Sequence, residues 1–228
     1  MNDHVRDLAA VREATERLLS AANGLDNASL AEPSRLPGWS RGHVLAHLAR
    51  NADALVNVLG GHPMYPSAGA RDSDIERDAD RDLGTQLKDV RESSTRLAVA
   101  AQIPADWSRT VELRNGVTDS ASRLPFRRLV EVELHHVDLG IGYELEDLPA
   151  GFVQQEINFL AERFRGLDSV PAVLIRQDDG RLVRTGHQGG TPLTVTGRQA
   201  DLVGWLAGRR DGAALTVTGG PLPLLPPL

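Results

Sequence analysis

Two stretches of the sequence decide the fold: SRGHVLAHLARN at residues 40–51 and RRLVEVELHHVDL at residues 127–139. Both have the apolar periodicity of a helix. The first contains two histidines four residues apart, and the second contains a glutamate followed four residues later by a histidine. Side chains four residues apart lie on the same face of a helix. We therefore expect each helix to direct a pair of potential metal ligands toward one shared point.

The two pairs are His43 with His47 and Glu131 with His135. Imidazole and carboxylate groups suit zinc, and a site with three protein ligands leaves one coordination position open for chemistry. The chain contains no cysteine, so any sulfur that takes part in that chemistry must come from outside the protein.

Other interpretations of these helices stay open on spacing alone. Glu133 and His136 form a Glu-x-x-His pair, which is the spacing used in di-iron bundles. Such a site also needs carboxylates from other helices, and the first stretch is followed only by Asp53, which lies off the His47 face. This favours a mononuclear site. A solvated acidic face with a histidine near the helix end explains the second stretch almost equally well.

Composition narrows the class of protein. The chain has 228 residues, 41% of them hydrophobic, and a formal net charge of -6. A negative chain is poorly suited to nucleic acid, because neutralising phosphates needs clustered lysine and arginine. No apolar run approaches the roughly 20 residues of a membrane span. The charged N-terminal residues do not have the pattern of a signal peptide, so we expect a cytoplasmic protein without a nucleic-acid or membrane partner.

The first part of the chain has the helix content of a four-helix bundle. The predicted helices span residues 3–23, 41–59 and 73–102, and a fourth begins near Pro125. Ser40 and Ser73 are the expected N-caps of the second and third helices. Residues 103–122 are expected to be irregular, because Pro104, Asn115 and Gly116 break the helical pattern. Four-helix bundles place metal sites in their interior on facing helices, which agrees with the paired ligands.

The character of the sequence changes near residues 143–149. A helix is expected over residues 150–165, followed by short β-rich segments and one more helix. These β-rich segments are residues 171–177, 181–186, 191–197 and 213–219, and the helix between the last two covers residues 199–206. We therefore predict an α+β protein with two domains, a four-helix bundle over residues 1–145 and a smaller α+β domain over residues 146–228.

Arginines are the second group of candidate functional residues. Arg71, Arg77 and Arg81 flank the start of the third predicted helix, and Arg209 and Arg210 follow the last one. A guanidinium binds a carboxylate through two parallel hydrogen bonds. Most arginines serve only surface solubility, so position alone leaves both roles open.

Four segments carry a resemblance to a known family. They are LPGWSRGHVLAHLARNADAL at 36–55, PMYPSAGARDSDIE at 63–76, LPFRRLVEVELHHVDLGIGY at 124–143 and GRQADLVGWLAGRRDGAALTVTGG at 197–220. Together they resemble the mycothiol-dependent maleylpyruvate isomerases, which belong to the DinB-like group of metal-binding four-helix bundles. The resemblance covers most of the chain.

The resemblance implies a zinc ion held by His47, Glu131 and His135. His43 then becomes a neighbour of the site, and Glu133 and His136 take supporting or structural roles.

The resemblance also implies that arginines from both domains hold the carboxylates of the substrate. Arg77 and Arg209 match these catalytic and substrate-binding positions best, and Arg81 is a further substrate-binding candidate. The expected ligands are a small dicarboxylate and a low-molecular-weight thiol, here mycothiol.

The implied activity is conversion of maleylpyruvate to fumarylpyruvate in gentisate degradation, a pathway of aromatic catabolism. A thiolate adds to the cis double bond, the resulting single bond rotates, and elimination gives the trans product. Zinc would keep the thiol deprotonated at neutral pH. The alternatives are a zinc-dependent mycothiol S-transferase and a non-catalytic ligand-binding protein that zinc stabilises. We expect a monomer.

Overall fold

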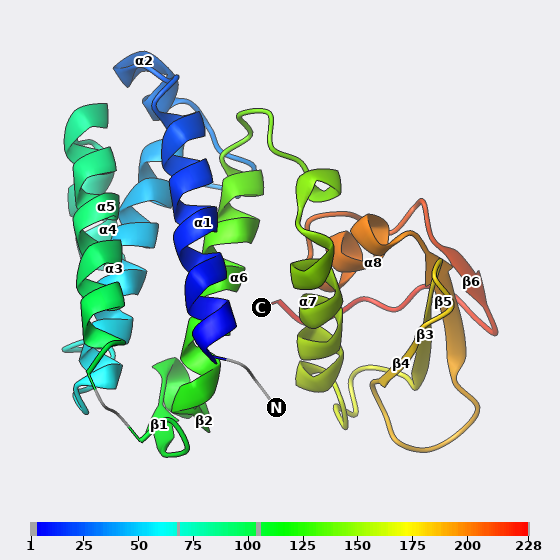
Figure 1. The fold of residues 1–228 in the computed structure, drawn as a ribbon. Coiled ribbons are helices and arrows are strands. Elements are labelled where there is room, and N and C mark those ends of the chain that lie inside the picture. The colour runs from blue at the N-terminus through cyan, green and yellow to red at the C-terminus, as the bar shows by residue number, and fades with distance from the viewer. Residues whose placement is uncertain (1–3, 68, 104–105, 228) are drawn as a thin grey trace. The chain divides into compact units, whose positions relative to one another are not determined.

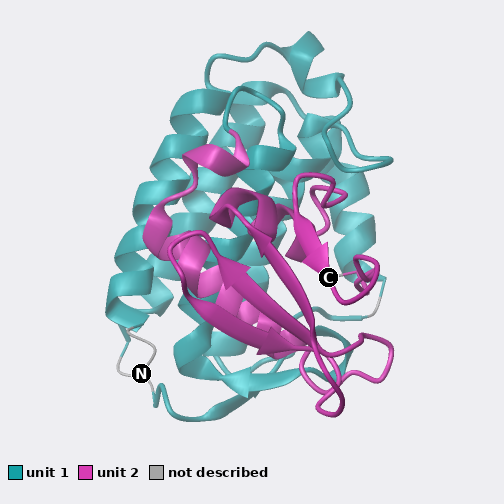
Figure 2. Cartoon of the chain, turned by 90° about the vertical axis from the view of Figure 1, so that its right-hand side faces the viewer, with its two compact units in different colours: residues 1–143 teal, residues 144–228 magenta. Residues whose placement is uncertain are grey.

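The computed structural model describes residues 4–67, 69–103 and 106–227. The chain divides into two compact units, unit 1 with residues 1–143 and unit 2 with residues 144–228 (Figure 2). Unit 1 is mainly helical and unit 2 contains a four-stranded sheet with helices, so the predicted α+β class is confirmed. The domain boundary expected after residue 145 stays a prediction, close to the division between the units.

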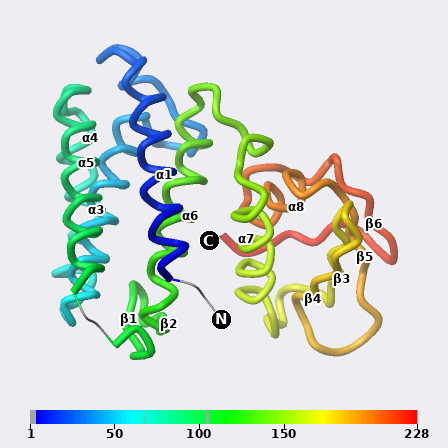
Figure 3. Tube along the Cα trace, viewed as in Figure 1, coloured from blue at the N-terminus to red at the C-terminus, as the bar shows by residue number. Residues whose placement is uncertain are grey.

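Unit 1 is built around a bundle of long helices. Its helices are α1 (His4–Ala22), α2 (Asn27–Ala31), α3 (Arg41–Leu59), α4 (Ala70–Ala79), α5 (Leu83–Ala100) and α6 (Leu124–Asp138). In the bundle α3 packs against α5 and α6, and α1 packs against α6, as the chain trace shows (Figures 1 and 3). None of the helices in the described part of the chain combines the length and apolar character that crossing a membrane requires.

Helix α3, which carries the first ligand pair, has the predicted bounds for local reasons. The Ser40 Oγ accepts a hydrogen bond from the His43 backbone N–H at 3.3 Å, which caps the helix N-terminus. Gly42 lets α3 approach α4, because a Cβ at this position would overlap the carbonyl oxygen of Ala79. The helix ends at Gly60. Capping and close packing therefore hold α3 firmly in place.

The single helix predicted over residues 73–102 is wrong. The structure has two helices there, α4 and α5, and Ser73 lies inside α4 rather than at its N-cap. Asp82 interrupts the predicted helix, because its Oδ1 accepts a hydrogen bond from the Thr85 backbone N–H at 3.0 Å and caps the N-terminus of α5. Aspartate at such a position favours a new helix start over helix continuation.

Residues 103–122, predicted to be irregular, contain a hairpin of β1 (Thr110–Glu112) and β2 (Thr118–Ser120). Asn115 and Gly116 form its turn with φ values of 60° and 72°. Asparagine followed by glycine is a strong hairpin signal, and it should have predicted this turn. The helix-breaking role given to Pro104 lies outside the described residues.

The first and fourth predicted helices are present. Residue 3, the predicted start of the first helix, lies outside the described residues, and α1 is followed by the short helix α2, which the sequence did not predict. Helix α6 begins at Leu124 with Pro125 in its first turn, as expected. It ends at Asp138, and Gly140 has a φ of 65° just beyond. Ile141, whose spacing in the sequence continues the apolar stripe of this helix, therefore lies outside it.

Unit 2 contains a four-stranded sheet with two helices. Its elements are α7 (Ala150–Arg163), β3 (Val173–Gln177), β4 (Leu182–Thr185), β5 (Leu193–Gly197), α8 (Gln199–Leu206) and β6 (Thr216–Thr218). The strand order is β4-β3-β5-β6, in which β3 and β5 are parallel and the other neighbours are antiparallel. Val195 of β5 is fully buried and pairs with Ile175 on one side and Val217 on the other.

Short 3-10 helices complete the described chain at Arg114–Gly116, Ala121–Arg123 and Leu145–Asp147. The two similar segments predicted as strands, ending at Gly197 and Gly219, contain the neighbouring strands β5 and β6. The DDG segment turns between β3 and β4, and Gly180 takes a φ of 87° there.

Candidate metal centre

Three side chains from α3 and α6 converge inside unit 1. His47 Nε2 lies 2.8 Å from Glu131 Oε2, and His135 Nε2 lies 3.2 Å from the same oxygen. One ligand atom from each residue lies within 4.8 Å of the others. We call these residues the triad. The predicted ligand set is thus brought together, although His47 and Glu131 are far apart in the sequence.

The triad is buried at its histidines and open at its carboxylate. His47 and His135 are 4% and 9% exposed, whereas the Glu131 side chain is 32% exposed. The Asp138 Oδ2 lies 2.8 Å from His135 Nδ1, which leaves Nε2 of that ring for the site. A carboxylate behind a ligating histidine fixes the tautomer and the ring orientation, and this arrangement is common at zinc sites.

The surroundings set the protonation of the triad. Burial lowers the pKa of His47 to about 4, although the Glu131 carboxylate opposes the shift. Burial alone would raise the pKa of Glu131, but the two histidines outweigh it and hold the pKa well below its usual range. His47 is therefore neutral and Glu131 ionised at neutral pH, which are the forms that bind a metal.

Arg71 of α4 lies beside the triad. Its Nη2 is 3.4 Å from His47 Nδ1, and its guanidinium carbon lies 5.7 Å from the centre of the Trp39 ring. The Arg71 side chain is 17% exposed, and Nη1 donates to Asp72 at 2.6 Å. From the sequence alone, Arg71 could serve either surface solubility or the site. Its spacing does not show which face of α4 its side chain occupies.

Tyr65 is a second neighbour that sequence reasoning missed. Burial raises the pKa of its hydroxyl; the Arg71 guanidinium opposes the shift and the Glu131 carboxylate adds to it. The hydroxyl therefore stays protonated at neutral pH, close to the charged groups of the site.

Arg77 and Arg81, the predicted substrate-binding arginines of this region, belong to an ion-pair cluster. Asp78 is fully buried and accepts hydrogen bonds from both of them and from Arg50, whose Nη1 donates at 2.9 Å. Asp89 accepts from Arg50 at 2.7 Å and from Arg81 at 3.1 Å. We call this group the Asp78 cluster. It ties α3, α4 and α5 together, and the substrate role of both arginines stays a prediction.

The other histidine and glutamate candidates have local partners. His43 Nδ1 lies 2.7 Å from the Ser40 Oγ at the start of α3. Glu133 accepts hydrogen bonds from Arg17 at 2.5 Å and from the Tyr143 hydroxyl at 2.8 Å. The His136 ring stacks on Tyr143 with 4.0 Å between ring centroids. Among the described residues, only the triad forms a group of three potential metal ligands.

Arg209 lies in unit 2, just after α8. Its Nη1 donates to the Ala207 carbonyl at 2.7 Å. Arg210, which follows it, forms ion pairs with Asp201 and Glu146 of the same unit at 2.6 and 2.7 Å. The catalytic and substrate-binding role of Arg209 stays a prediction.

The donor set of the triad fits a zinc ion. Ligands bound about 2 Å from one ion lie roughly 3–4 Å from each other. In the triad the carboxylate oxygen lies 2.8 and 3.2 Å from the two ring nitrogens, and all three atoms lie within 4.8 Å of one another, so small shifts would open the site to the size of the ion. Two imidazoles and one carboxylate are groups that zinc binds readily. His47, Glu131 and His135 can therefore hold a metal, and the exposed side of Glu131 leaves room for a further ligand.

Comparisons with known proteins cover both units. Residues 11–140 match a family model described as the mycothiol maleylpyruvate isomerase N-terminal domain, and residues 147–227 match the corresponding C-terminal domain. The crystal structure of a mycothiol-dependent maleylpyruvate isomerase is 26% identical, with a TM-score of 0.88. The match covers 99% of this chain and 97% of that one.

A second solved structure, a histidine-to-alanine mutant of a mycothiol-dependent maleylpyruvate isomerase, matches with the same identity, coverage and TM-score. No significant match was found among curated proteins.

Proposed function

Because the chain belongs to the mycothiol maleylpyruvate isomerase family, we propose that it converts maleylpyruvate to fumarylpyruvate with zinc and mycothiol. The triad is the observation that supports this most strongly. It lies within the segment that matches the N-terminal family model, and its three ligand atoms converge. Three protein ligands leave one coordination position open, which a catalytic zinc site needs and a structural one lacks.

In this proposal the triad holds the zinc and Asp138 keeps His135 in place. When bound, zinc and mycothiol together would supply a thiolate at neutral pH, because coordination deprotonates a thiol. The Asp138 carboxylate would accept a hydrogen bond from the Nδ1–H of His135, which would leave the Nε2 lone pair of that ring free to bind the metal. Neutral His47 and ionised Glu131 need no proton loss before they bind.

Arg71 is our first choice for holding a substrate carboxylate. It lies beside His47 and is mostly buried against Trp39, so its guanidinium is poorly hydrated. Hydrogen bonds from such a group to a carboxylate are stronger than those of a solvated one. Addition of a nucleophile to the substrate places negative charge on an enolate oxygen, and a guanidinium fixed nearby stabilises that charge without reorganising.

Tyr65 can support the same step as a hydrogen-bond donor. Because burial raises the pKa of its hydroxyl, the group keeps its proton at neutral pH and can donate it in a hydrogen bond to a substrate oxygen. Arg209, proposed as a second carboxylate-binding residue, would come from unit 2. A cytoplasmic location and a monomeric state remain part of the proposal.

The test is a spectrophotometric assay of the zinc-loaded chain with mycothiol and maleylpyruvate. We expect the ultraviolet spectrum of the substrate to change to that of fumarylpyruvate, and omission of mycothiol should abolish the change. Absence of conversion with stoichiometric zinc would contradict the proposal. Mass spectrometry distinguishes the S-transferase alternative, since a transferase accumulates a thiol adduct and an isomerase releases free product.

A further inference from the structure

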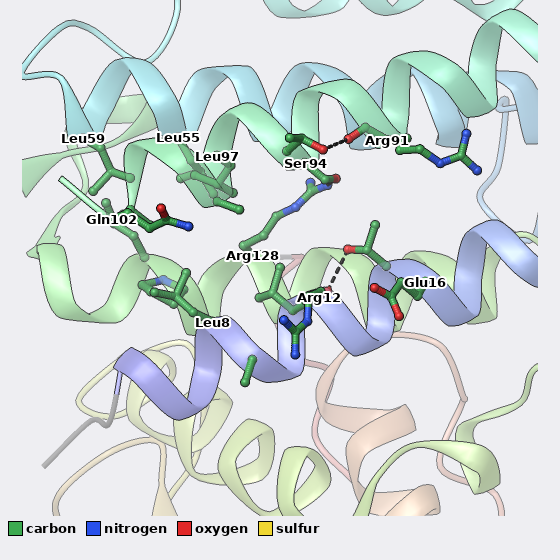
Figure 4. A pocket seen from close by; sticks show the side chains of 18 of the residues that line it. Leu8, Arg12, Glu16, Leu55, Leu59, Arg91, Ser94, Leu97, Gln102 and Arg128 are labelled. Carbon is green, nitrogen blue, oxygen red and sulfur yellow. Dashed lines mark hydrogen bonds between the residues drawn. The ribbon is translucent and has the colours of Figure 1, made fainter.

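Helices α1 and α5 line a cavity of about 560 Å³ in unit 1 (Figure 4). Its walls extend from Leu8 to Leu19 along α1 and from Arg91 to Ala98 along α5, and Ala101 and Gln102 continue the wall just beyond the end of α5. The eleven residue-to-residue steps from Leu8 to Leu19 span about 16 Å of helix, so the cavity is elongated along the bundle. Its volume lies within the roughly 300–1,000 Å³ of small-molecule sites. The triad residues are not among its described lining.

One end of the cavity is apolar. Leu8, Leu59, Leu97 and Leu124 line it together with Trp107. In Figure 4, Leu8 and Leu59 lie near Gln102 at this end, away from Arg91 and Glu16. An aliphatic or aromatic body placed here would replace water at apolar side chains, which is favourable in proportion to the area covered.

The other end is cationic. Arg12, Arg91 and Arg128 line the cavity with one acidic residue, Glu16. The lining thus carries an excess of positive charge in a chain whose net charge is -6. A ligand complementary to this cavity has an apolar body and a single negative head group.

Arg128 is the centre of the cationic end. Its Nη1 donates to the Leu48 carbonyl and to Asn51 Oδ1, both at 2.8 Å, whereas its Nη2 reaches Ser94 Oγ only at 3.4 Å. The residue is 1% exposed, and its buried Nε has no hydrogen-bond partner among the residues that the structure describes.

Within the described chain, no carboxylate lies at ion-pair distance from Arg128, and Glu131 and Asp53 attract it only at longer range. Burial lowers the pKa of Arg128 to about 10, so the group is still charged at neutral pH. A buried charge without a counter-ion is costly, and a bound anion would offset that cost.

We propose that the cavity between α1 and α5 binds a medium-chain aliphatic carboxylate of about ten carbons. The carboxylate lies at Arg128 and Arg91, and the chain runs past Leu97 toward Trp107. Arg91 lies one helical turn from Ser94, which Arg128 already contacts; its exposed side chain extends away from Arg128 in Figure 4 and has to rotate inward to join Arg128 at the head group. The elongated shape favours a linear chain over a compact ring. This site is independent of the isomerase proposal, because it uses none of the triad residues.

The test is calorimetric titration of the zinc-loaded chain with decanoate below its aggregation concentration. We expect saturable binding of one decanoate per chain. Decanol, which has the same chain without the charge, should bind at least about tenfold more weakly, because it lacks the charge-assisted hydrogen bonds. The His135→Ala variant should bind decanoate as the unmodified chain does, which excludes capture of the carboxylate by the metal.

Variants locate the site. Arg91→Gln changes an exposed side chain and should weaken decanoate binding about tenfold. Arg128→Met should weaken it at least as much, and Ala98→Trp should block the cavity from α5. Lys88→Gln is the matched control, since it removes one positive charge from the same helix at a residue that does not line the cavity.

Three results would overturn the proposal. The first is the absence of saturable decanoate binding, and the second is equal affinity for decanol. The third is a loss of decanoate affinity in Arg91→Gln that is no larger than the loss in Lys88→Gln, because such a loss would reflect only the overall charge of the chain.

Sedimentation equilibrium tests a competing occupant of the cavity. If the chain is a dimer that Ala98→Trp dissociates, a second copy fills the cavity instead and the carboxylate site is wrong.

Discussion

The triad and the Asp78 cluster are two groups of charged and polar side chains in the same helical unit, and they differ in how their charges are satisfied. In the Asp78 cluster each carboxylate faces guanidinium groups, and Asp78 itself receives hydrogen bonds from three arginines. In the triad one carboxylate oxygen and one ring nitrogen from each of two imidazoles converge, with Asp138 behind His135 and Arg71 beside His47.

This difference separates a structural role from a binding role. Opposite charges that saturate one another have no capacity left for a ligand, and removing one partner leaves a buried charge. Convergent acceptors remain incomplete until a cation joins them. Ion-pair saturation, rather than the number of charged residues, therefore distinguishes the two sites. Single substitutions can disrupt the triad and the Asp78 cluster separately.

The largest expected effect follows from breaking the triad. Glu131→Gln removes the shared carboxylate, so bound zinc should fall to background and turnover should fall on the order of 10³-fold. Elemental analysis and the isomerase assay measure both.

Glu133→Gln is the matched control, because Glu133 lies on the same helix but binds Arg17 and Tyr143. It should keep its zinc. Zinc loss in Glu133→Gln together with retention in Glu131→Gln would transfer the site to the Glu133–His136 pair.

Breaking the Asp78 cluster should affect stability rather than metal content. Asp78→Asn removes the one fully buried carboxylate of the cluster, whereas Asp89 and Asp74 still pair with its arginines, so we expect a loss of about 2 kcal/mol in unfolding free energy with zinc retained. Urea denaturation of the unmodified chain and of the Asp78→Asn variant measures this loss of stability. Unchanged stability at neutral pH would mean that the cluster contributes nothing.

We also expect the difference in stability between the unmodified chain and Asp78→Asn to depend on pH. Burial alone would raise the pKa of Asp78, but Arg77, Arg81 and Arg50 together lower it. A lowered folded-state pKa gives stability that is present above the unfolded value of about 3.9 and is lost as the pH falls through the folded value. The difference in unfolding free energy between the unmodified chain and Asp78→Asn should therefore be constant near neutral pH. It should shrink toward zero as the pH becomes acidic.

The smallest and sharpest test compares two arginines of α4. Arg71→Ala should lower kcat/KM about 100-fold, because it removes a desolvated donor beside the triad. Arg77→Ala should change kcat/KM less than about threefold, because Arg77 is 58% exposed and pairs with Asp74 and Asp78. Steady-state kinetics at stoichiometric zinc measures both. An equal or larger loss in Arg77→Ala would assign the substrate carboxylate to Arg77, as the sequence predicted.

Local signals predicted much of the fold. The bounds of α3 follow from Ser40 and Gly60, and the strands of unit 2 follow from four β-rich segments, three of which end at a glycine. The break between α4 and α5 was missed because a continuous apolar stripe outweighed the Asp82 cap. The β1–β2 hairpin was missed because Asn115 and Gly116 were interpreted only as helix breakers.

The arginines show where sequence reasoning ends. Arg71 and Arg77 are six residues apart, which corresponds to a rotation of about 240° around a helix, so they cannot face the same site. Spacing shows that only one of them can face the triad, but it does not show which. That choice depends on the side of α4 that packs against α3.

The sequence by itself determined the ligand types, the four-residue spacing that places each pair on one helix face, and the division into a helical part and an α+β part. These features are local, since they depend on helical and extended periodicity. Only the tertiary structure decided that His47 of α3 meets Glu131 of α6, that Arg71 lies beside them, and that Arg128 is buried with no carboxylate of the described residues at ion-pair distance. Each of these depends on how separate helices pack against one another, and no local pattern encodes that packing.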